Sequence, residues 1–299
     1  LGLHLYRSII FPMNRMIIGA LLLLVFNSCA ENKNIITSGN STQPGTESTF
    51  DIVTWNIEQF PKNNLTVSYL AELIDSMNVD IIAMQEIWGD GASGSFENLK
   101  TKLDGWDGYR KSSGLAYLYK TELTINSLTE INELNEIIRK PYLLSLTWGG
   151  QNIYVINNHF KAFSGAENEA ERKIASEKIE NYINEYLEDL NVIVLGDLND
   201  ELNDEESVNV FQNFIIDSTN YKFVDMDIAY SSSSNWSYPS WPSHLDHILI
   251  TNELFDEFEN EGSSVQTIRL EEYFDNGWTE YENYISDHRP VGLRLKFSQ

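Results

Sequence analysis

The sequence is poor in cysteine and in basic residues, and each shortage excludes a class of protein. Cys29 is the one cysteine among 299 residues, so no disulfide within the chain can hold the fold and the core must do so alone. Twenty Lys and Arg stand against 45 Asp and Glu, which gives a formal net charge of −25. This charge argues against a protein that coats nucleic acid by neutralising its phosphates. It leaves open an enzyme that cleaves nucleic acid, because bound divalent cations can supply local positive charge.

Long apolar runs are also missing, with one short exception near the N-terminus. The run Met16 to Phe26 follows Arg15, and no acidic residue precedes Glu31. A basic residue before a short apolar run is typical of a secretion signal, and the run is shorter than a membrane-spanning helix, which needs about 20 residues. We therefore predict a cleaved signal peptide over residues 1–28 and an exported protein, either secreted or attached to the cell envelope.

Cys29 lies just after this run, in the sequence Phe26-Asn27-Ser28-Cys29. This segment resembles the processing site of bacterial lipoproteins, in which the cysteine becomes the lipidated first residue. An ordinary signal peptide with an incidental thiol is the alternative. Residues 29–49 contain few large apolar side chains and many small polar ones, which predicts a flexible tether between a lipid anchor in the membrane and the folded domain.

From Phe50 to the C-terminus, short apolar runs alternate with amphipathic stretches. A short apolar run predicts a strand, and an apolar period of about 3.6 residues predicts a helix. The expected strands are Phe50–Ile57, Asp80–Met84, Leu115–Tyr119, Tyr142–Trp148, Ile153–Asn157, Val192–Leu195, His247–Thr251, Val265–Leu270 and Val291–Phe297. Mixed strands with helices between them predict one α/β or α+β domain over residues 50–299, with sheet at its centre.

Two helices and one turn are the clearest local features of this domain. Leu65–Met77 is amphipathic, and Ala166–Leu187 is the longest expected helix. In the longer helix the apolar face is expected to consist of Ala170, Ile174, Ile179, Ile183 and Leu187. The segment Gly149-Gly150-Gln151 joins two expected strands and predicts a tight hairpin turn. Sequence repeats with a fixed period are absent.

Polar residues gather where the expected strands end and the loops turn toward solvent. The strand-end residues are Asn56 and Glu58, Gln85 and Glu86, Asn157 to His159, Gly196 to Asp200 without Leu198, and Ser286 to Arg289. A single carboxylate after a strand is often only the cap of the following helix. The joint pattern is more specific, because every histidine after residue 28 lies in one of these clusters or in the segment 243–247. A purely structural role would scatter the histidines.

In chain order, the clusters TWNI, QE, NHF, GDLN, LDHI and SDH resemble the motifs of the endonuclease/exonuclease/phosphatase superfamily. Its members include deoxyribonuclease I, apurinic endonucleases, sphingomyelinases and inositol polyphosphate phosphatases. The resemblance covers residues 50–297. It implies a four-layer α/β/β/α sandwich, with two mixed β-sheets face to face and helices outside, and a hydrolase that acts on phosphate esters.

The resemblance also implies a site for a divalent metal ion. Glu86 matches the carboxylate that binds the metal, assisted by Asn56, and Glu58 lies at the second acidic position of the Asn56 motif. Asp287 matches a further acid of the metal site. Mg²⁺ prefers hard oxygen ligands and keeps several waters, so few carboxylates are needed. We therefore expect Mg²⁺ as the cofactor, with Mn²⁺ and Ca²⁺ as alternatives.

The remaining motifs carry the catalytic groups that the resemblance implies. Asp197 and Asn199 match the pair that orients or deprotonates the attacking water and hydrogen-bonds the phosphate. His288 matches the essential histidine, with Asp246 as its carboxylate partner. His159 matches the second histidine of the deoxyribonuclease I and sphingomyelinase branches, which stabilises the pentacovalent state or protonates the leaving oxygen.

Three further features have two interpretations or a lesser expected role. Arg139 resembles a basic residue that contacts substrate phosphate, and a solvated charge is the alternative. His244 and His247 are expected to have a structural or rim role. Residues 231–243 place aromatic side chains among small polar ones, either as a stacking surface for bases or sugars or as simple packing. The aromatic residues of this segment are Trp236, Tyr238 and Trp241.

These residues together predict hydrolysis of a phosphodiester bond by in-line attack of a metal-oriented water. The pairing of His159 with His288 favours a secreted, nonspecific endonuclease of the deoxyribonuclease I type, acting as a monomer on nucleic acid. The alternatives are a sphingomyelinase-like enzyme, an inositol or sugar phosphate hydrolase, and a catalytically inactive lipoprotein that uses the fold for binding. The acidic net charge counts against a nuclease, and competent residues at every matched position count against the binding protein.

Overall fold

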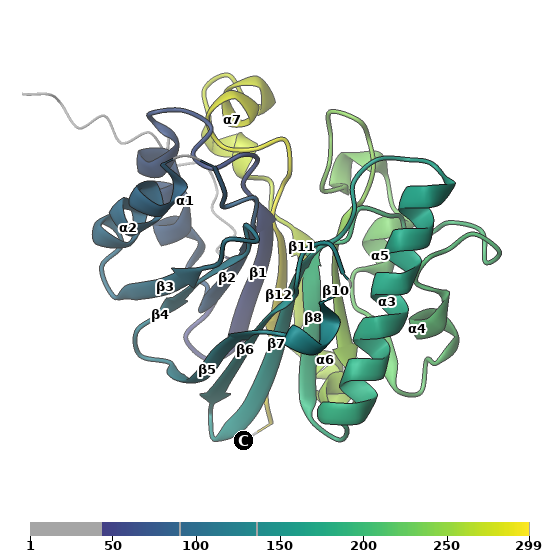
Figure 1. Cartoon of the computed structure of the whole chain (residues 1–299). Coiled ribbons are helices and arrows are strands. Elements are labelled where there is room, and N and C mark those ends of the chain that lie inside the picture. Colours follow the sequence, from purple (N-terminus) through teal and green to yellow (C-terminus); the bar gives the residue numbers. More distant parts are fainter. Residues whose placement is uncertain (1–43, 90, 136, 299) are drawn as a thin grey trace, which may run out of the picture. The chain divides into compact units, whose positions relative to one another are not determined.

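The computed structural model describes residues 44–89, 91–135 and 137–298 (Figure 1). The predicted signal peptide, residues 1–28, and the predicted lipidation site Cys29 lie outside these residues, as do residues 30–43 of the predicted tether. Within the described ranges, every helix is too short or too polar to cross a membrane.

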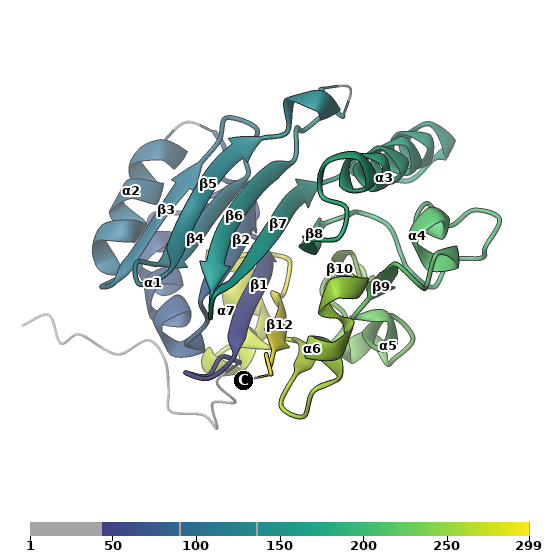
Figure 2. The same cartoon turned by 90° about the horizontal axis from the view of Figure 1, so that it is seen from below.

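Two mixed sheets of six strands form the centre of the fold, and the first contains the earliest strand of the domain (Figures 1 and 2). In the first sheet, β1 (Phe50–Asn56) pairs in parallel with β2 (Ile81–Gln85) and antiparallel with β12 (Val291–Leu295). The order of strands is β11-β12-β1-β2-β4-β3. The other three strands are β3 (Trp106–Arg110), β4 (Ala116–Lys120) and β11 (Ser264–Thr267).

The second sheet brings three strand ends together. Its order is β5-β6-β7-β8-β10-β9, with β5 (Thr124–Glu130), β6 (Tyr142–Trp148), β7 (Gln151–His159), β8 (Asn191–Asp197), β9 (Tyr221–Phe223) and β10 (Asp246–Thr251). Parallel pairing of β7 with β8 places His159 opposite Asp197, and antiparallel pairing of β8 with β10 places Asp246 opposite Asp197. The register therefore aligns three predicted site residues at one edge of the sheet.

Helices cover the outer face of each sheet, and apolar side chains fill the space between the sheets. The inner layer includes Ile52 and Tyr117 from the first sheet and Leu144 and Ile193 from the second. The first sheet is covered by α1 (Thr66–Met77) and α2 (Ala92–Lys102), and the second by α3 (Ala166–Tyr186), α4 (Gln212–Ile216) and α5 (Met226–Ala229) (Figure 2). This arrangement confirms the predicted four-layer α/β/β/α sandwich.

Short helices complete the architecture. They are α6 (Phe255–Glu259), α7 (Trp278–Tyr284) and the 3₁₀ turns Asn132–Leu134, Ser233–Asn235, Asn252–Leu254 and Leu270–Tyr273. The expected strand Val265–Leu270 is shorter in the structure, because β11 ends at Thr267 and Leu270 begins the following 3₁₀ turn. The hairpin between β6 and β7 turns at Gly149 and Gly150, whose φ angles of 55° and 85° suit glycine.

The apolar face of α3 differs from the prediction. Ile179, Ile183 and Leu187 are buried as expected, but Ala170 is exposed and Ile174 is 48% exposed. Arg172, Ala175 and Ser176 take the inward positions of the first half of the helix. The reason is an ion pair: Nε of Arg172 lies 2.7 Å from Oδ2 of Asp200, which holds a charged residue inside and turns the neighbouring apolar positions outward.

The described part of the predicted tether, residues 44–49, packs on the domain. The backbone N–H of Gly45 donates to the carbonyl of Met77 at 3.1 Å. The backbone N–H of Thr46 and the hydroxyl of Thr49 donate to Oδ2 of Asp51 at 2.9 Å and 2.7 Å. Residues 44–49 are therefore bonded to the domain that was predicted to begin at Phe50.

Candidate active site

The predicted catalytic and metal-binding residues meet in one cavity at the ends of both sheets. This cavity has a volume of about 640 Å³, and the predicted residues that line it are Asn56, Glu86, His159, Asp197, Asn199, Asp287 and His288. Asp246 is fully buried behind His288. Glu58 and Arg139 contact the lining residues from behind rather than facing the cavity. The structure thus assembles side chains that are far apart in the sequence.

Asn56 orients two carboxylates at the end of β1. Its Nδ2 donates to Oδ2 of Asp197 at 2.8 Å and to Oε1 of Glu86 at 3.4 Å. Its Oδ1 accepts the backbone N–H of Glu58 at 3.0 Å, which fixes the orientation of the amide. Asn56 therefore presents its amino group to the cavity, and its oxygen is already engaged. Asn56 thus helps to hold Glu86 in place, and its part in binding the metal stays a prediction.

Glu86 and Asp287, the carboxylates that the motifs assign to the metal, both line the cavity. Glu86 follows β2 in the left-handed region, with φ 62°, and its Oε2 accepts the backbone N–H of Gln59 at 2.9 Å. Oε2 of Glu58 accepts the backbone N–H of Asp287 at 3.1 Å and also contacts Nζ of Lys62. Glu58 therefore positions Asp287, and its direct role at the metal stays a prediction.

The charge around Asp287 fits a bound divalent cation. Burial raises the pKa of Asp287, and the charges of Glu58 and Glu86 add to this against the opposing effect of His288, so that the pKa reaches about 6. A cation between Glu86 and Asp287 would relieve this repulsion. Both groups offer hard carboxylate oxygens, which suit Mg²⁺ with water completing its coordination. The side chains present therefore fit the cofactor that the motifs predict.

His288 is held as a cation by Asp246. Its Nδ1 lies 2.7 Å from Oδ2 of Asp246, and its backbone N–H donates to Oγ of Ser286 at 3.0 Å. Burial lowers the pKa of His288, but the carboxylates of Asp246 and Asp197 outweigh burial and raise the pKa to about 10. Asp197, Asp246 and His288 lie close enough together for a metal site. Because Nδ1 of His288 is bonded to Asp246 while the ring lines the cavity, we assign this group the catalytic role that the motif implies.

Asp197 is buried between the two site histidines. Its Oδ2 lies 3.6 Å from Nε2 of His159 and 3.9 Å from Nε2 of His288. Its Oδ1 accepts the backbone N–H of Asn199 at 3.1 Å. Burial raises the pKa of Asp197 to about 7 in spite of the opposing charge of His288. A carboxylate with a pKa near neutral suits a group that takes a proton from water.

His159 is held by an aromatic ring instead of a carboxylate partner. Its imidazole stacks on the indole of Trp88 with centroids 5.5 Å apart and an interplanar angle of 26°. Burial and the positive charges of Arg139 and His288 keep the pKa of His159 well below 6.5, so the ring is neutral. Its Nε2 faces carboxylate oxygens of Asp197 and Glu86, at 3.6 Å and 3.9 Å, which places the proton on that nitrogen.

Arg139 contacts both His159 and Trp88. Its Nη1 donates to the backbone carbonyls of His159 and Phe160 at 3.2 Å and 2.8 Å. Its guanidinium lies 5.0 Å from the centroid of the Trp88 ring. The alternative of a solvated surface charge is therefore excluded. Arg139 fixes the end of β7, and whether it also contacts substrate phosphate stays a prediction.

The aromatic segment 231–243 divides between packing and exposure. Nε1 of Trp236 donates to the carbonyl of Ile228 at 3.1 Å, which is a packing role. Tyr238 packs on the imidazole of His288, with centroids 4.7 Å apart. Trp241 lines the cavity and is 76% exposed. The packing interpretation therefore holds for Trp236, and a stacking role for Trp241 stays a prediction.

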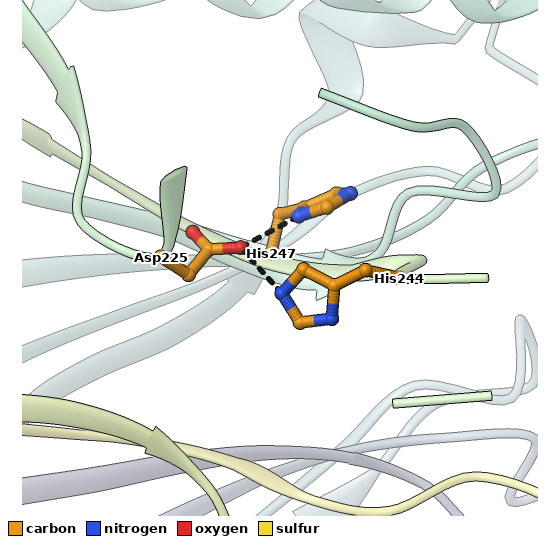
Figure 3. A group of neighbouring side chains, drawn as sticks. All are labelled: Asp225, His244 and His247. Carbon is orange, nitrogen blue, oxygen red and sulfur yellow. Dashed lines mark hydrogen bonds and ion pairs between the residues drawn. The ribbon is translucent and has the colours of Figure 1, made fainter. Parts of the chain in front are cut away.

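Several residues that support the site were missed by the sequence analysis. Trp88 stacks on His159, Ser237 accepts the backbone N–H of Asp246, and Asp225 bonds to His244 and His247. These three lie outside the six motifs, and only the folded structure brings them to the neighbourhood of the site. Ser286 was predicted as part of the SDH cluster, and its hydroxyl accepts the backbone N–H of His288. His244 and His247 do not line the cavity; both bond to buried Asp225, as expected for a structural role (Figure 3).

The sequence from residue 53 to residue 288 matches the model of the Endonuclease/Exonuclease/phosphatase family. The chain therefore belongs to this family, whose members are hydrolases that act on phosphoester bonds. No curated protein sequence matches the chain. The family assignment agrees with the resemblance that the six motifs carry, and the match spans all of them.

Solved structures of low sequence identity share the fold. TDP2 of D. rerio complexed with a single-strand DNA product is 16% identical, with a TM-score of 0.63, over 84% of this chain and 100% of that chain. A family protein from Bacteroides thetaiotaomicron is 15% identical, with a TM-score of 0.57, over 84% and 98%. The human nocturnin catalytic domain with bound sulfate is 17% identical, with a TM-score of 0.56, over 85% and 96%. At these identities the likeness establishes the fold alone.

Proposed function

We propose that the chain is a metal-dependent phosphodiesterase that cleaves nucleic acid as a secreted, nonspecific endonuclease of the deoxyribonuclease I type. The observation that carries this proposal is the placement of Asp197 between two histidines at one cavity. Its Oδ2 lies 3.6 Å from Nε2 of His159 and 3.9 Å from Nε2 of His288. A buried acceptor with a donor on either side is suited to in-line attack on a phosphodiester.

The proposed cofactor is Mg²⁺, with Mn²⁺ and Ca²⁺ as alternatives. Glu86 and Asp287 would hold the ion, while Asn56 and Glu58 keep these two carboxylates in place. When bound, a divalent ion neutralises charge on the phosphate and lowers the pKa of coordinated water.

The side chains divide the remaining chemistry among them. Asp197, whose pKa is about 7, takes a proton from the attacking water, and Asn199 holds the Oδ1 of Asp197 through its backbone N–H. The charged His288 donates from Nε2 to the phosphoryl oxygens as negative charge builds up on them. The neutral His159 donates from Nε2 to the phosphoryl group or the leaving oxygen.

Two observations support nucleic acid as the substrate class. Arg139 adds a positive charge next to His159, behind the wall of the cavity. The related fold of TDP2 was crystallised with a single-strand DNA product. The net charge of −25 counts against this choice, and sphingomyelinase-like or inositol or sugar phosphate hydrolysis are the alternatives. We further propose that the protein is an exported monomer, anchored to the cell envelope by lipid at Cys29, with release from the cell as a secreted enzyme as the alternative.

The test is an activity panel on the purified protein with plasmid DNA, RNA, sphingomyelin, inositol phosphates and bis-p-nitrophenyl phosphate, each with Mg²⁺, Mn²⁺, Ca²⁺ or chelator. We expect plasmid cleavage that chelator and Glu86→Gln both abolish. Glu122→Gln, an exposed glutamate away from the cavity, is the matched control and should cleave at the wild-type rate. Cleavage of a lipid or sugar phosphate alone would move the protein to another branch of the family, and a folded but inactive wild type would favour the binding lipoprotein.

A further inference from the structure

A buried group of one carboxylate and two histidines lies outside the active-site cavity, beside β10 (Figure 3). Oδ2 of Asp225 is 3.0 Å from Nε2 of His244 and 2.6 Å from Nδ1 of His247. All three side chains are at most 2% exposed. Figure 3 shows both rings directed at the same carboxylate. Burying three ionisable groups costs free energy unless they pair with one another.

The hydrogen-bond pattern excludes a metal at this group. The backbone N–H of Ser237 donates to Nδ1 of His244 at 3.3 Å, so that nitrogen carries the lone pair and Nε2 carries the proton. A protonated Nε2 can donate to Asp225 but cannot bind a metal. His247 faces an acceptor at each nitrogen, Asp225 at Nδ1 and the carbonyl of Asp200 at Nε2, 2.8 Å away. His247 therefore donates from both nitrogens and is positively charged.

One arm of this network reaches the loop that follows β8. His247 holds the carbonyl of Asp200, three residues after Asp197. The side chain of Asp200 is held as well, because Nε of Arg172 donates to its Oδ2 at 2.7 Å. Asp200 is thus fixed from two directions. Between Asp197 and Asp200 lies Asn199, with φ 53°, a left-handed conformation that depends on its surroundings.

The other arm reaches Asp246 and His288 through Ser237. This serine is fully buried, and its Oγ accepts the backbone N–H groups of Leu245 and Asp246, each at 3.1 Å. Its carbonyl accepts the backbone N–H of Arg289 at 2.7 Å, the residue directly after His288. Ser237 therefore links the start of β10 in one sheet to the loop before β12 in the other, and its own N–H is held by His244.

We propose that Asp225, His244, His247 and Ser237 form a positioning network that fixes Asp197 and Asn199 on one arm and the Asp246–His288 pair on the other. None of the four touches the cavity, so they act through the catalytic groups. The inference rests on the proposed phosphodiesterase function for its catalytic consequence. Misplacement of a catalytic group by about 1 Å can cost roughly 10²-fold in rate. Supporting hydrogen bonds of this kind are what hold catalytic side chains in a productive arrangement.

The electrostatics of the group agree with this assignment. Burial alone would raise the pKa of Asp225, but His247 and His244 outweigh burial and hold the pKa far below its usual 3.8. Burial lowers the pKa of His247, and Asp225 more than reverses this effect, so that the pKa is raised above 6.5. Both pKa shifts therefore favour the ionised form of the pair Asp225 and His247.

The test compares Asp225→Asn with wild type and with Asp256→Asn, an exposed carboxylate on α6. Asparagine keeps the size of Asp225 but must turn its amino group either toward both histidines, which share Oδ2, or toward the backbone N–H of Ile248, which donates to Oδ1. We expect kcat for bis-p-nitrophenyl phosphate to fall about 10- to 100-fold, with KM and the Mg²⁺ requirement within about twofold of wild type. We also expect the downfield proton resonance of Nδ1 in His288, which arises from its 2.7 Å contact with Asp246, to shift or broaden.

The resonance separates positioning from mere stabilisation, because a destabilised protein would keep the wild-type resonance in its folded fraction. An unchanged resonance in folded Asp225→Asn protein overturns the proposal, as does a wild-type kcat. If the variant does not fold, Ser237→Ala decides by the same two criteria, because it removes only the hydroxyl that holds Leu245 and Asp246. If the wild type turns over no phosphodiester, the proposed function fails, and the resonance alone then tests the network.

Discussion

His288 and His159 line the same cavity, yet the chain holds them by different means. His288 is bonded through Nδ1 to the buried carboxylate of Asp246 at 2.7 Å. His159 stacks on Trp88. Burial lowers the pKa of both rings. In His159 this effect dominates, and the pKa lies well below 6.5. In His288 the neighbouring carboxylates outweigh burial and raise the pKa to about 10. At neutral pH one imidazole is therefore charged and the other is not.

The difference teaches how one site obtains two kinds of donor from one residue type. A buried carboxylate partner gives a permanent cation, which suits the charge that develops on a phosphoryl group. An aromatic partner and a nearby guanidinium give a neutral donor that can release a proton without leaving an uncompensated charge. Separating the pKa values of like groups by their environments is a recurring way to assign acid and base roles.

The largest expected effect comes from removing each histidine in turn. We expect His288→Ala to lower kcat about 10³-fold and His159→Ala about 10²-fold, because only the first removes a full positive charge from the transition state. The measurement is steady-state hydrolysis of bis-p-nitrophenyl phosphate at pH 7, with circular dichroism as the check on folding. Equal losses in the two variants would contradict the division of roles.

A smaller loss is expected from Asp246→Asn, which leaves His288 in place but removes its partner. We expect kcat at pH 7 to fall about 10²-fold. Since Asp246 raises the pKa of His288 to about 10, the wild-type ring stays charged up to the alkaline range. Without the carboxylate, burial lowers this pKa, and the charged form is lost at a lower pH. The alkaline limb of the pH–rate profile should therefore move toward acid in the variant.

The sign of the accompanying stability effect follows from the same shift. A folded pKa of about 10 lies above the ordinary 6.5, so the Asp246–His288 interaction stabilises the fold fully below pH 6.5. This contribution is lost as the pH rises from 6.5 through 10. Thermal melts of wild type and Asp246→Asn should therefore differ most at low pH and converge above pH 10. A difference in melting temperature that grows with pH would contradict the assigned charge of His288.

The centre of the fold was predictable because its strands are buried on both faces. Strands β1, β6, β8 and β12 are nearly continuous apolar runs, and the sequence analysis located each of them. Strand β9, with only three residues, was missed, and so were strands β3 and β5. The side chains of β3 and β5 are largely half-buried or exposed, so their residues show no continuous apolar run. Edge strands such as these are set by pairing with a neighbour rather than by their own composition.

The catalytic side chains were predictable for a different reason. They stand at strand ends in a fixed chain order, and that order survives in the sequence as six short motifs. The residues that support them do not share this property. Trp88 meets His159 and Asp225 meets His247 across long separations in sequence. The orientation of Asn56 was likewise not predictable, since it depends on which neighbour bonds its oxygen.

The smallest expected effect concerns Trp88, which tests the aromatic half of the comparison. Gly114 leaves room for this indole, because a Cβ there would lie 2.5 Å from Cε3 of Trp88. Aromatic pairs contribute about 0.5–1.5 kcal/mol, which corresponds to at most about tenfold in rate. We therefore expect Trp88→Leu to lower kcat up to about tenfold, while Trp148→Leu, at a tryptophan that packs on Phe50 and Phe297, leaves kcat unchanged. If Trp88→Leu matched the loss in His159→Ala, the indole would do more than hold the ring, and His159 would depend on its stacking partner as fully as His288 depends on Asp246.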